Sequence, residues 1–183
     1  MFVSFGEVVD FAVMTFIVGY IFSDFFIFKR VKPVFDLKAI LFAAAITAPA
    51  IVLHELAHKF AAISLGLTAT FHAAYFWLMI GIIMKALSPG FIFFVPAFVS
   101  IQGLSTPLTQ TIVSAAGPLT NLALFLIAWA VLALKFTNNS MAVFFLKLTK
   151  RINGFLFLFN MIPIPGFDGF QFFSGAYRLI FKV

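Results

Sequence analysis

The sequence predicts a mainly α-helical, polytopic membrane protein with about five to six membrane segments. A small strand-like or re-entrant region is expected between the second and fourth hydrophobic segments. Two observations support this fold class. Hydrophobic residues make up 63% of the 183 residues and charged residues 10%, whereas soluble domains carry about 25% charged residues. The apolar residues also gather in runs of roughly 20, which matches the thickness of a bilayer.

We expect residues 1–183 to form a single integral membrane domain. Its core would lie at 37–169, with an N-terminal helix at 11–28 and a short C-terminal segment at 170–183. The first residues are acidic rather than basic and no small-residue cleavage site follows, so the first apolar run is interpreted as a permanent span and not a removed signal.

Charge and cysteine content limit the classes of function. The net charge is +6, but Lys and Arg lie in short loops and at segment ends, which suits anionic lipid headgroups better than nucleic acid. We therefore expect a lipid bilayer as partner and no nucleic acid. Because the chain has no cysteine, disulfides, thiolate catalysis and cysteine zinc sites are excluded. Any bound metal must use histidine and carboxylate.

The first two hydrophobic segments are expected at 11–28 and 37–65. Asp24, near the end of the first, is interpreted as an interfacial residue and not as a buried functional carboxylate. A basic loop at 29–38 separates the two segments. Pro49 lies inside the second segment, where it can kink the helix and free backbone carbonyls.

Two stretches at 66–72 and 91–101 are rich in aromatic and β-branched residues and predict strands. Between them, 77–87 is apolar but only about a dozen residues long, so it is either a tilted span or a re-entrant segment. A strand in lipid must be paired or line a cavity. Its edge could hold an extended peptide by strand addition; a plain structural hairpin is the alternative. The candidates for strand addition are Phe93, Val95, Phe98 and Val99.

A further span is expected at 112–134, and its small residues near the start allow close helix packing. Asn121 is the polar group in that packing, and it either makes an interhelical hydrogen bond or binds a developing oxyanion. The next apolar run is interrupted by basic residues, so its fully apolar part is 152–162. Two prolines and two glycines within 160–169 must then unwind the helix.

The second segment holds His54, Glu55 and His58 within a run that otherwise predicts a buried membrane helix. Ionisable groups are costly there, and such a cluster indicates a functional site. Residues four apart share one face of a helix, so the two histidines can bind one Zn²⁺, and Glu55 lies where it can take a proton from water. Histidines that merely satisfy helix contacts are the alternative, but this leaves Glu55 unpaired in hydrocarbon.

Asp168 is a carboxylate on the broken helix. Taken alone it is best explained as a turn residue before Gly169. If it reaches His54 and His58, the three residues and a position for water make a catalytic zinc site rather than a structural one. We expect one Zn²⁺ per chain.

These residues together resemble the site-2 protease family of intramembrane zinc metalloproteases. Three motifs match in order: His-Glu-Leu-Ala-His at 54–58, Gly-Pro-Leu-Thr-Asn at 117–121, and Asn160 through Pro163, Pro165, Asp168 and Gly169. The resemblance implies that His54, His58 and Asp168 bind zinc and that Glu55 activates the water. It also implies that Asn121 supports the site. Residues that would shape the last loop are Asn160, Pro163, Pro165 and Gly169.

The resemblance implies cleavage of transmembrane helices of other membrane proteins. We expect a compact form without a PDZ domain, located in the cell membrane of a prokaryote. A zinc protease with a glutamate as third ligand is excluded because the chain has too few glutamates. Besides Glu55 it has only Glu7, which is expected to precede the first span. A metal transporter or a catalytically silent homologue that binds metal or substrate remains the alternative. The basic loop at 29–38 would be cytoplasmic by the positive-inside rule, whereas the resemblance implies a site nearer the cytosol than this topology allows.

Overall fold

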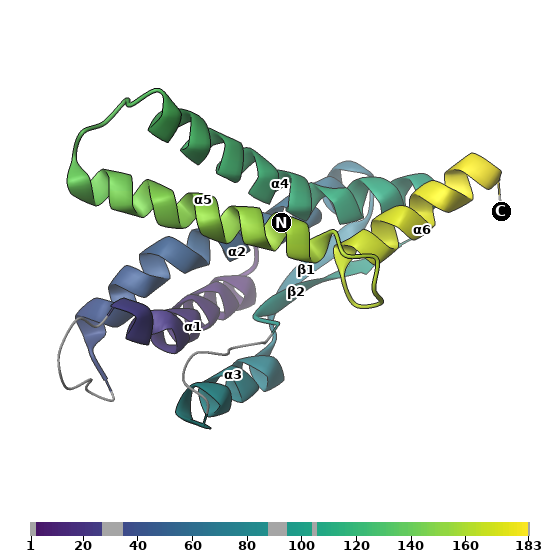
Figure 1. Cartoon of the computed structure of the whole chain (residues 1–183). Coiled ribbons are helices and arrows are strands. Elements are labelled where there is room, and N and C mark those ends of the chain that lie inside the picture. The colour runs from purple at the N-terminus through teal and green to yellow at the C-terminus, as the bar shows by residue number, and fades with distance from the viewer. Residues whose placement is uncertain (1–2, 27–34, 88–94, 104–105, 183) are drawn as a thin grey trace. The chain divides into compact units, whose positions relative to one another are not determined.

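A computed structural model describes residues 3–26, 35–87, 95–103 and 106–182 (Figure 1). The chain divides into two compact units. The N-terminal unit comprises 1–52 and 70–100, and the C-terminal unit comprises 53–69 and 101–183. The elements in order are α1 (Phe5–Phe22), a 3-10 helix (Ser23–Phe26), α2 (Leu37–Ser64), β1 (Thr68–Ala73), α3 (Tyr75–Leu87), β2 (Ala97–Gln102), α4 (Pro107–Ala133), α5 (Ser140–Asn160) and α6 (Asp168–Phe181).

Helix α1 begins six residues before the expected start at residue 11. A 3-10 helix follows it from Ser23 to Phe26, and the last two residues of the expected helix lie outside the described residues. The cause of the early start is a capping box. The Ser4 hydroxyl accepts a hydrogen bond from the Glu7 backbone N–H, and the Glu7 carboxylate accepts one from the Ser4 N–H. This motif satisfies free backbone donors at a helix start, and a search for apolar runs overlooks it because both residues are polar.

The N-terminal unit has a core of side chains from α1, α3 and both strands. Phe71 of β1 stacks on Phe11 of α1, with ring centroids 3.9 Å apart. The buried members of the core are Met14, Val18, Phe71, Ala73, Leu78 and Ala97. Asp24 forms an ion pair with Lys85, 3.0 Å between carboxylate and ammonium. The position of Asp24 at a membrane interface stays a prediction.

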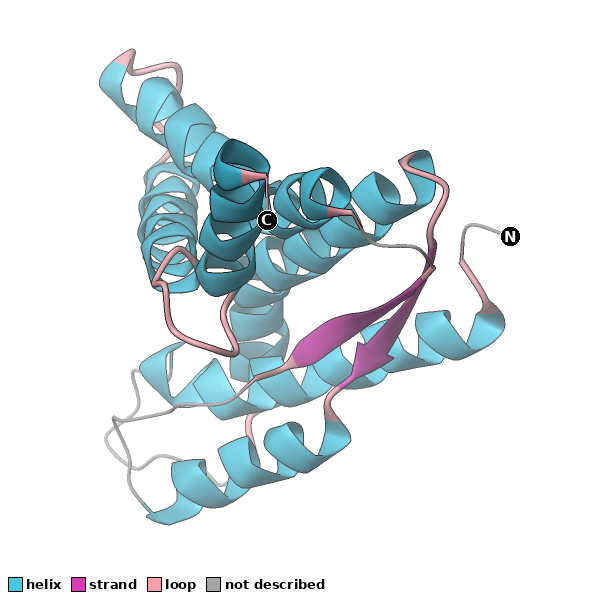
Figure 2. Ribbon diagram, turned by 90° about the vertical axis from the view of Figure 1, so that its right-hand side faces the viewer, coloured by secondary structure: helices cyan, strands magenta, loops and turns pink. Residues whose placement is uncertain are grey.

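The predicted strand region between the second and fourth segments is confirmed as a two-stranded sheet (Figure 2). The strands are antiparallel, because Ala74 donates its N–H to Pro96 and Thr68 donates its hydroxyl to the Gln102 carbonyl. Of the four strand-addition candidates, Phe98 and Val99 lie in β2 and Val95 lies just before it. Phe93 lies outside the described residues.

Among the described residues, three helical segments are long and apolar enough to cross a membrane: Phe5–Phe25, Leu37–Ser64 and Pro107–Ala133. Helix α3 is apolar but shorter, at 13 residues. The expected five to six membrane segments are therefore not confirmed. Helix α2 has almost the predicted bounds and continues through Pro49.

In the C-terminal unit, α4 begins at Pro107, five residues before the expected position. Thr106 caps it and Pro107 occupies the first turn, where its missing N–H costs nothing. Helices α4 and α5 lie side by side, joined by a turn (Figure 1). Helix α5 runs from Ser140 to Asn160, so it includes the basic residues that interrupt the apolar run as well as most of the fully apolar part at 152–162.

The predicted unwinding after α5 is confirmed. The helix ends at Asn160, Gly166 adopts a left-handed backbone conformation with φ of 99°, and α6 starts at Asp168. Helix α6 lies against α4. Gln110 of α4 donates from its amide to the Gln171 side chain at 2.7 Å. The C-terminal segment expected at 170–183 is thus mostly the body of this helix.

Candidate metal centre

The three predicted zinc ligands meet inside the C-terminal unit. His54 and His58 lie on successive turns of α2 and are buried, and Asp168 is the first residue of α6. Residues from two distant parts of the chain are brought together here, because α6 packs on α4 and the α2 histidines contact α4.

The three ligand atoms are as close as one zinc ion requires. The Nε2 atoms of His54 and His58 are 3.1 Å apart, and the Asp168 Oδ2 atom lies 3.1 Å from the first and 3.2 Å from the second. Ligands bound tetrahedrally at the usual zinc distances are separated by about 3.3 Å. The three separations are therefore short enough for His54, His58 and Asp168 to hold one zinc ion together.

Hydrogen bonds on the far side of each ring orient the two histidines. His58 donates from Nδ1 to the Val113 carbonyl at 2.7 Å, and His54 contacts the Asn121 amide oxygen through Nδ1 at 2.6 Å. A proton on Nδ1 leaves the Nε2 lone pair for a metal. Two such lone pairs and a carboxylate oxygen would repel one another without a cation between them. The donor set is therefore that of a metal site.

Asp168 is held in its ionised form. Burial raises the pKa of its carboxyl group, but the contacts with the imidazoles of His54 and His58 outweigh burial and bring the pKa below the ordinary range. Its position in the first turn of α6 adds to this effect, because the positive end of the helix dipole stabilises a negative charge. An ionised carboxylate is the form that binds a metal.

Glu55 follows the first ligand on α2 and interacts electrostatically with His54, His58 and Asp168. It is therefore close to the site but is not one of the three residues of the metal-binding group. This is the position expected for a residue that exchanges protons with a water molecule at the metal.

Gly117 of α4 faces the two imidazoles directly. A Cβ atom at this position would collide with the His58 ring and would lie 2.6 Å from Nε2 of His54. The small residues of the 117–121 motif were predicted to allow close helix packing, and the structure adds that Gly117 leaves the space in which the histidines converge.

The loop-shaping residues lie around the start of α6. Asn160 ends α5, and Pro163 and Pro165 lie in the turn that follows. Gly169 is buried, and a Cβ there would lie 2.8 Å from the Ile162 carbonyl oxygen and collide with Met161. The turn therefore packs directly on the residue next to Asp168, which holds that ligand in place.

Asn121 is fully buried and binds the imidazole of His54, on the side away from Asp168. A role in binding an oxyanion stays a prediction. Sequence reasoning missed Asn153 of α5, which is also buried and accepts a hydrogen bond from the Asn121 amide at 2.9 Å. Its only signal was a side-chain amide within a helix of mostly apolar and basic residues.

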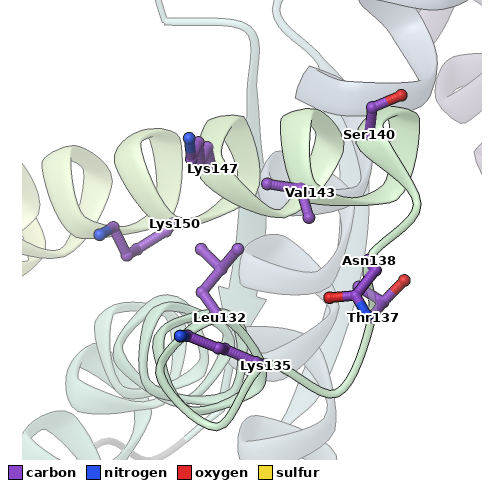
Figure 3. A pocket seen from close by; sticks show the side chains of 8 residues that line it. All are labelled: Leu132, Lys135, Thr137, Asn138, Ser140, Val143, Lys147 and Lys150. Carbon is purple, nitrogen blue, oxygen red and sulfur yellow. The ribbon is translucent and has the colours of Figure 1, made fainter.

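A separate hollow of about 500 Å³ lies at the turn between α4 and α5 (Figure 3). Its lining includes Lys135, Lys147 and Lys150 and none of the candidate site residues. The side chains drawn in Figure 3 are mostly basic or small and polar, so this hollow has no groups for zinc chemistry.

Comparison with known proteins agrees with the donor set. The chain is 32% identical over 164 residues to "Putative zinc metalloprotease MJ0611" of Methanocaldococcus jannaschii. The aligned region covers 89% of this chain and 81% of the relative. No family model matches the chain, and no solved structure matches it. Zinc is the metal that both the relative and the His-His-Asp group indicate. Because the similarity extends over most of both proteins, the chain belongs to the same family of zinc metalloproteases as this archaeal protein.

Proposed function

We propose that this protein is an intramembrane zinc metalloprotease of the site-2 type, which hydrolyses peptide bonds within or near the transmembrane helices of other membrane proteins. The observation that carries the proposal is the position of the metal-binding group. His54, Glu55 and His58 lie on α2, a 28-residue helix that is long and apolar enough to cross a membrane. A hydrolytic site on such a helix acts on substrates that are themselves in the membrane.

His54, His58 and Asp168 would hold the zinc, which supplies a Lewis acid that polarises a carbonyl and acidifies a water molecule. Glu55 would accept a proton from the attacking water and pass it to the leaving amide nitrogen. Water thus adds its oxygen to the carbonyl carbon and its two protons to the two products, and the peptide C–N bond breaks.

The substrate would bind as an extended strand along the sheet. In the N-terminal unit, β1 donates backbone N–H groups to carboxylates of α1: Phe71 to Glu7 at 2.8 Å and Ala73 to Asp10 at 3.1 Å. One edge of β1 is therefore engaged by α1, and its other edge pairs with β2. The remaining edge of the described sheet belongs to β2, where Phe98 is 50% exposed. A substrate helix unwound there would pair with this edge.

We place the protein in the cell membrane of a prokaryote. The three apolar helices support this, and α3 and α5 would supply the further membrane-embedded segments of the polytopic arrangement. Residues 1–183 would work as one protease domain on a transmembrane protein substrate.

The test is zinc content together with cleavage of a model transmembrane substrate in detergent. We expect about one zinc per chain and cleavage by the wild type. Glu55→Gln should retain the zinc and lose cleavage, because glutamine has nearly the same volume but cannot accept the proton. His58→Ala should lose both, whereas His72→Ala, which changes the third histidine of the chain, should retain the zinc.

Three results would contradict the proposal. Cleavage by Glu55→Gln at the wild-type rate would exclude Glu55 as the base. Zinc without cleavage of any substrate would favour the silent homologue. Absence of zinc in the wild type would exclude the metal centre itself.

A further inference from the structure

The two histidines are oriented in different ways. His58 donates directly to a backbone carbonyl, that of Val113. His54 instead contacts a side-chain amide, Asn121, which can turn either its oxygen or its nitrogen toward the ring. Something else must therefore decide which end of the Asn121 amide faces His54.

A second amide answers this requirement. The nitrogen of Asn121 donates to the oxygen of Asn153 at 2.9 Å, and the nitrogen of Asn153 donates to the Thr149 carbonyl at 2.8 Å. The three hydrogen bonds run in one line from His54 on α2, through Asn121 on α4, to the backbone of α5.

The direction of this line follows from its last member. A backbone carbonyl can only accept, so the Asn153 nitrogen must face Thr149 and its oxygen must face Asn121. That oxygen needs a donor, so the Asn121 nitrogen faces it and the Asn121 oxygen faces His54. His54 must then donate, which puts its proton on Nδ1 and its free lone pair on Nε2, the atom beside Asp168.

Any reversal within the line puts two acceptors face to face. If the Asn153 amide were turned, its oxygen would lie 2.8 Å from the Thr149 oxygen. If the Asn121 amide were turned, its oxygen would face the oxygen of Asn153. Both side chains are buried, at 0% and 1% exposure, so water has little access to relieve either repulsion.

We propose that Asn153 is a positioning residue of the metal centre: through Asn121, it fixes the tautomer of His54 in which Nε2 is free for zinc. It touches neither the metal nor the substrate. The inference rests on the zinc site of the proposed function, but it is tested by zinc affinity and ring protonation and not by proteolysis.

The first variant is Asn153→Leu, which keeps the volume but removes both hydrogen-bonding groups. The Asn121 amide then loses the acceptor that its nitrogen faces, and part of the protein should hold His54 in the other tautomer. Loss of such a supporting contact lowers metal affinity by about 10- to 100-fold. We expect a decrease in that range by competition with a chelator of known affinity. Asn138→Leu, the same change in the turn between α4 and α5, should leave the affinity unchanged.

The second background is Asn121→Asp. A carboxylate can only accept, so it holds the proton on Nδ1 of His54 without help from Asn153. In this background Asn153→Leu should not lower the zinc affinity, because the side chain at position 121 no longer needs Asn153 to orient it. A residue that merely fills space would cost the same in both backgrounds.

Histidine labelled with nitrogen-15 provides a second readout. In the zinc-free wild type, NMR should find the His54 proton on Nδ1. In zinc-free Asn153→Leu, it should find a mixture of two tautomers, one protonated on Nδ1 and the other on Nε2. The inference is overturned if Asn153→Leu binds zinc like the wild type, or if its loss is equal in the two backgrounds. If the wild type binds no zinc, the proposed function fails as well. If the wild type binds zinc but Asn153→Leu gives either of the two results above, only the inference about Asn153 is overturned and the proposed function stands.

Discussion

Gly117 is the residue at which the absence of a side chain matters most. It lies within α4, where glycine is less favourable than alanine by about 1 kcal/mol. The structure explains why a glycine occupies this position, because a Cβ atom there would collide with the imidazole rings of both His54 and His58. The glycine therefore serves the metal centre at the expense of the helix.

We predict that Gly117→Ala abolishes zinc binding without loss of helix content. The added methyl group occupies the space in which the Nε2 atoms of His54 and His58 converge, while alanine favours the helix. Zinc content of the purified variant and its circular dichroism spectrum check the two parts. Gly6→Ala is the matched control, since a Cβ at Gly6 meets only the Ser4 hydroxyl at 3.9 Å. Stoichiometric zinc in Gly117→Ala would contradict the prediction.

At the scale of elements, the turn between α5 and α6 decides where the third ligand lies. The turn folds back so closely that Gly169 packs on the backbone of Met161 and Ile162. Further along α6, Gly175 approaches α4, where a Cβ would lie 3.0 Å from the Pro107 carbonyl oxygen. The close approach of α6 to its neighbours depends on residues without side chains at both points.

We predict that Gly169→Ala lowers zinc affinity by at least about tenfold. The methyl group cannot fit against the Met161 and Ile162 backbone, so the start of α6 must move and take Asp168 with it. The measurement is a zinc titration against a chelator. Phe170→Ala, at a position that is 38% exposed, changes the next residue without adding a contact and should bind zinc normally. Equal affinities in both variants would show that the turn does not position Asp168.

At the scale of the whole molecule, apolar side chains cover much of the exposed surface of the helices. On α4 alone, six large ones are more than 40% exposed: Leu108, Ile112, Leu119, Leu126, Ile127 and Trp129. Water would penalise this surface, at roughly 25 cal/mol for each Å² of apolar area, whereas lipid does not. The surface thus agrees with the apolar composition in favouring a bilayer.

We predict that the protein remains in the membrane fraction when expressing cells are washed with alkaline carbonate, and that only detergent releases it. A wash of this kind removes proteins held at the surface by charge, which distinguishes spanning helices from attraction of the basic residues to anionic headgroups. Release of most of the protein by carbonate would contradict an intramembrane site.

Much of this protein can be predicted from the sequence because the signals are local. The bounds of α2 follow from an apolar run, and the pairing of His54 with His58 follows from the pitch of a helix. The prolines and glycines after Asn160 predict the break before Asp168 from their backbone chemistry alone. Errors arose at the starts of α1 and α4, where polar capping residues extend a helix beyond its apolar part.

Only the tertiary structure decided how the metal-binding group is supported. Nothing in the sequence joins Asn153 to Asn121, or the Val113 carbonyl to His58, because these contacts depend on which faces of α2, α4 and α5 meet. The same holds for Gly117 and Gly169. The reason for a glycine at each position is clear only when the atoms that occupy the place of a side chain are known. Spacing along one helix selects the ligand atoms, whereas packing between helices determines their orientation and hence whether they can bind zinc.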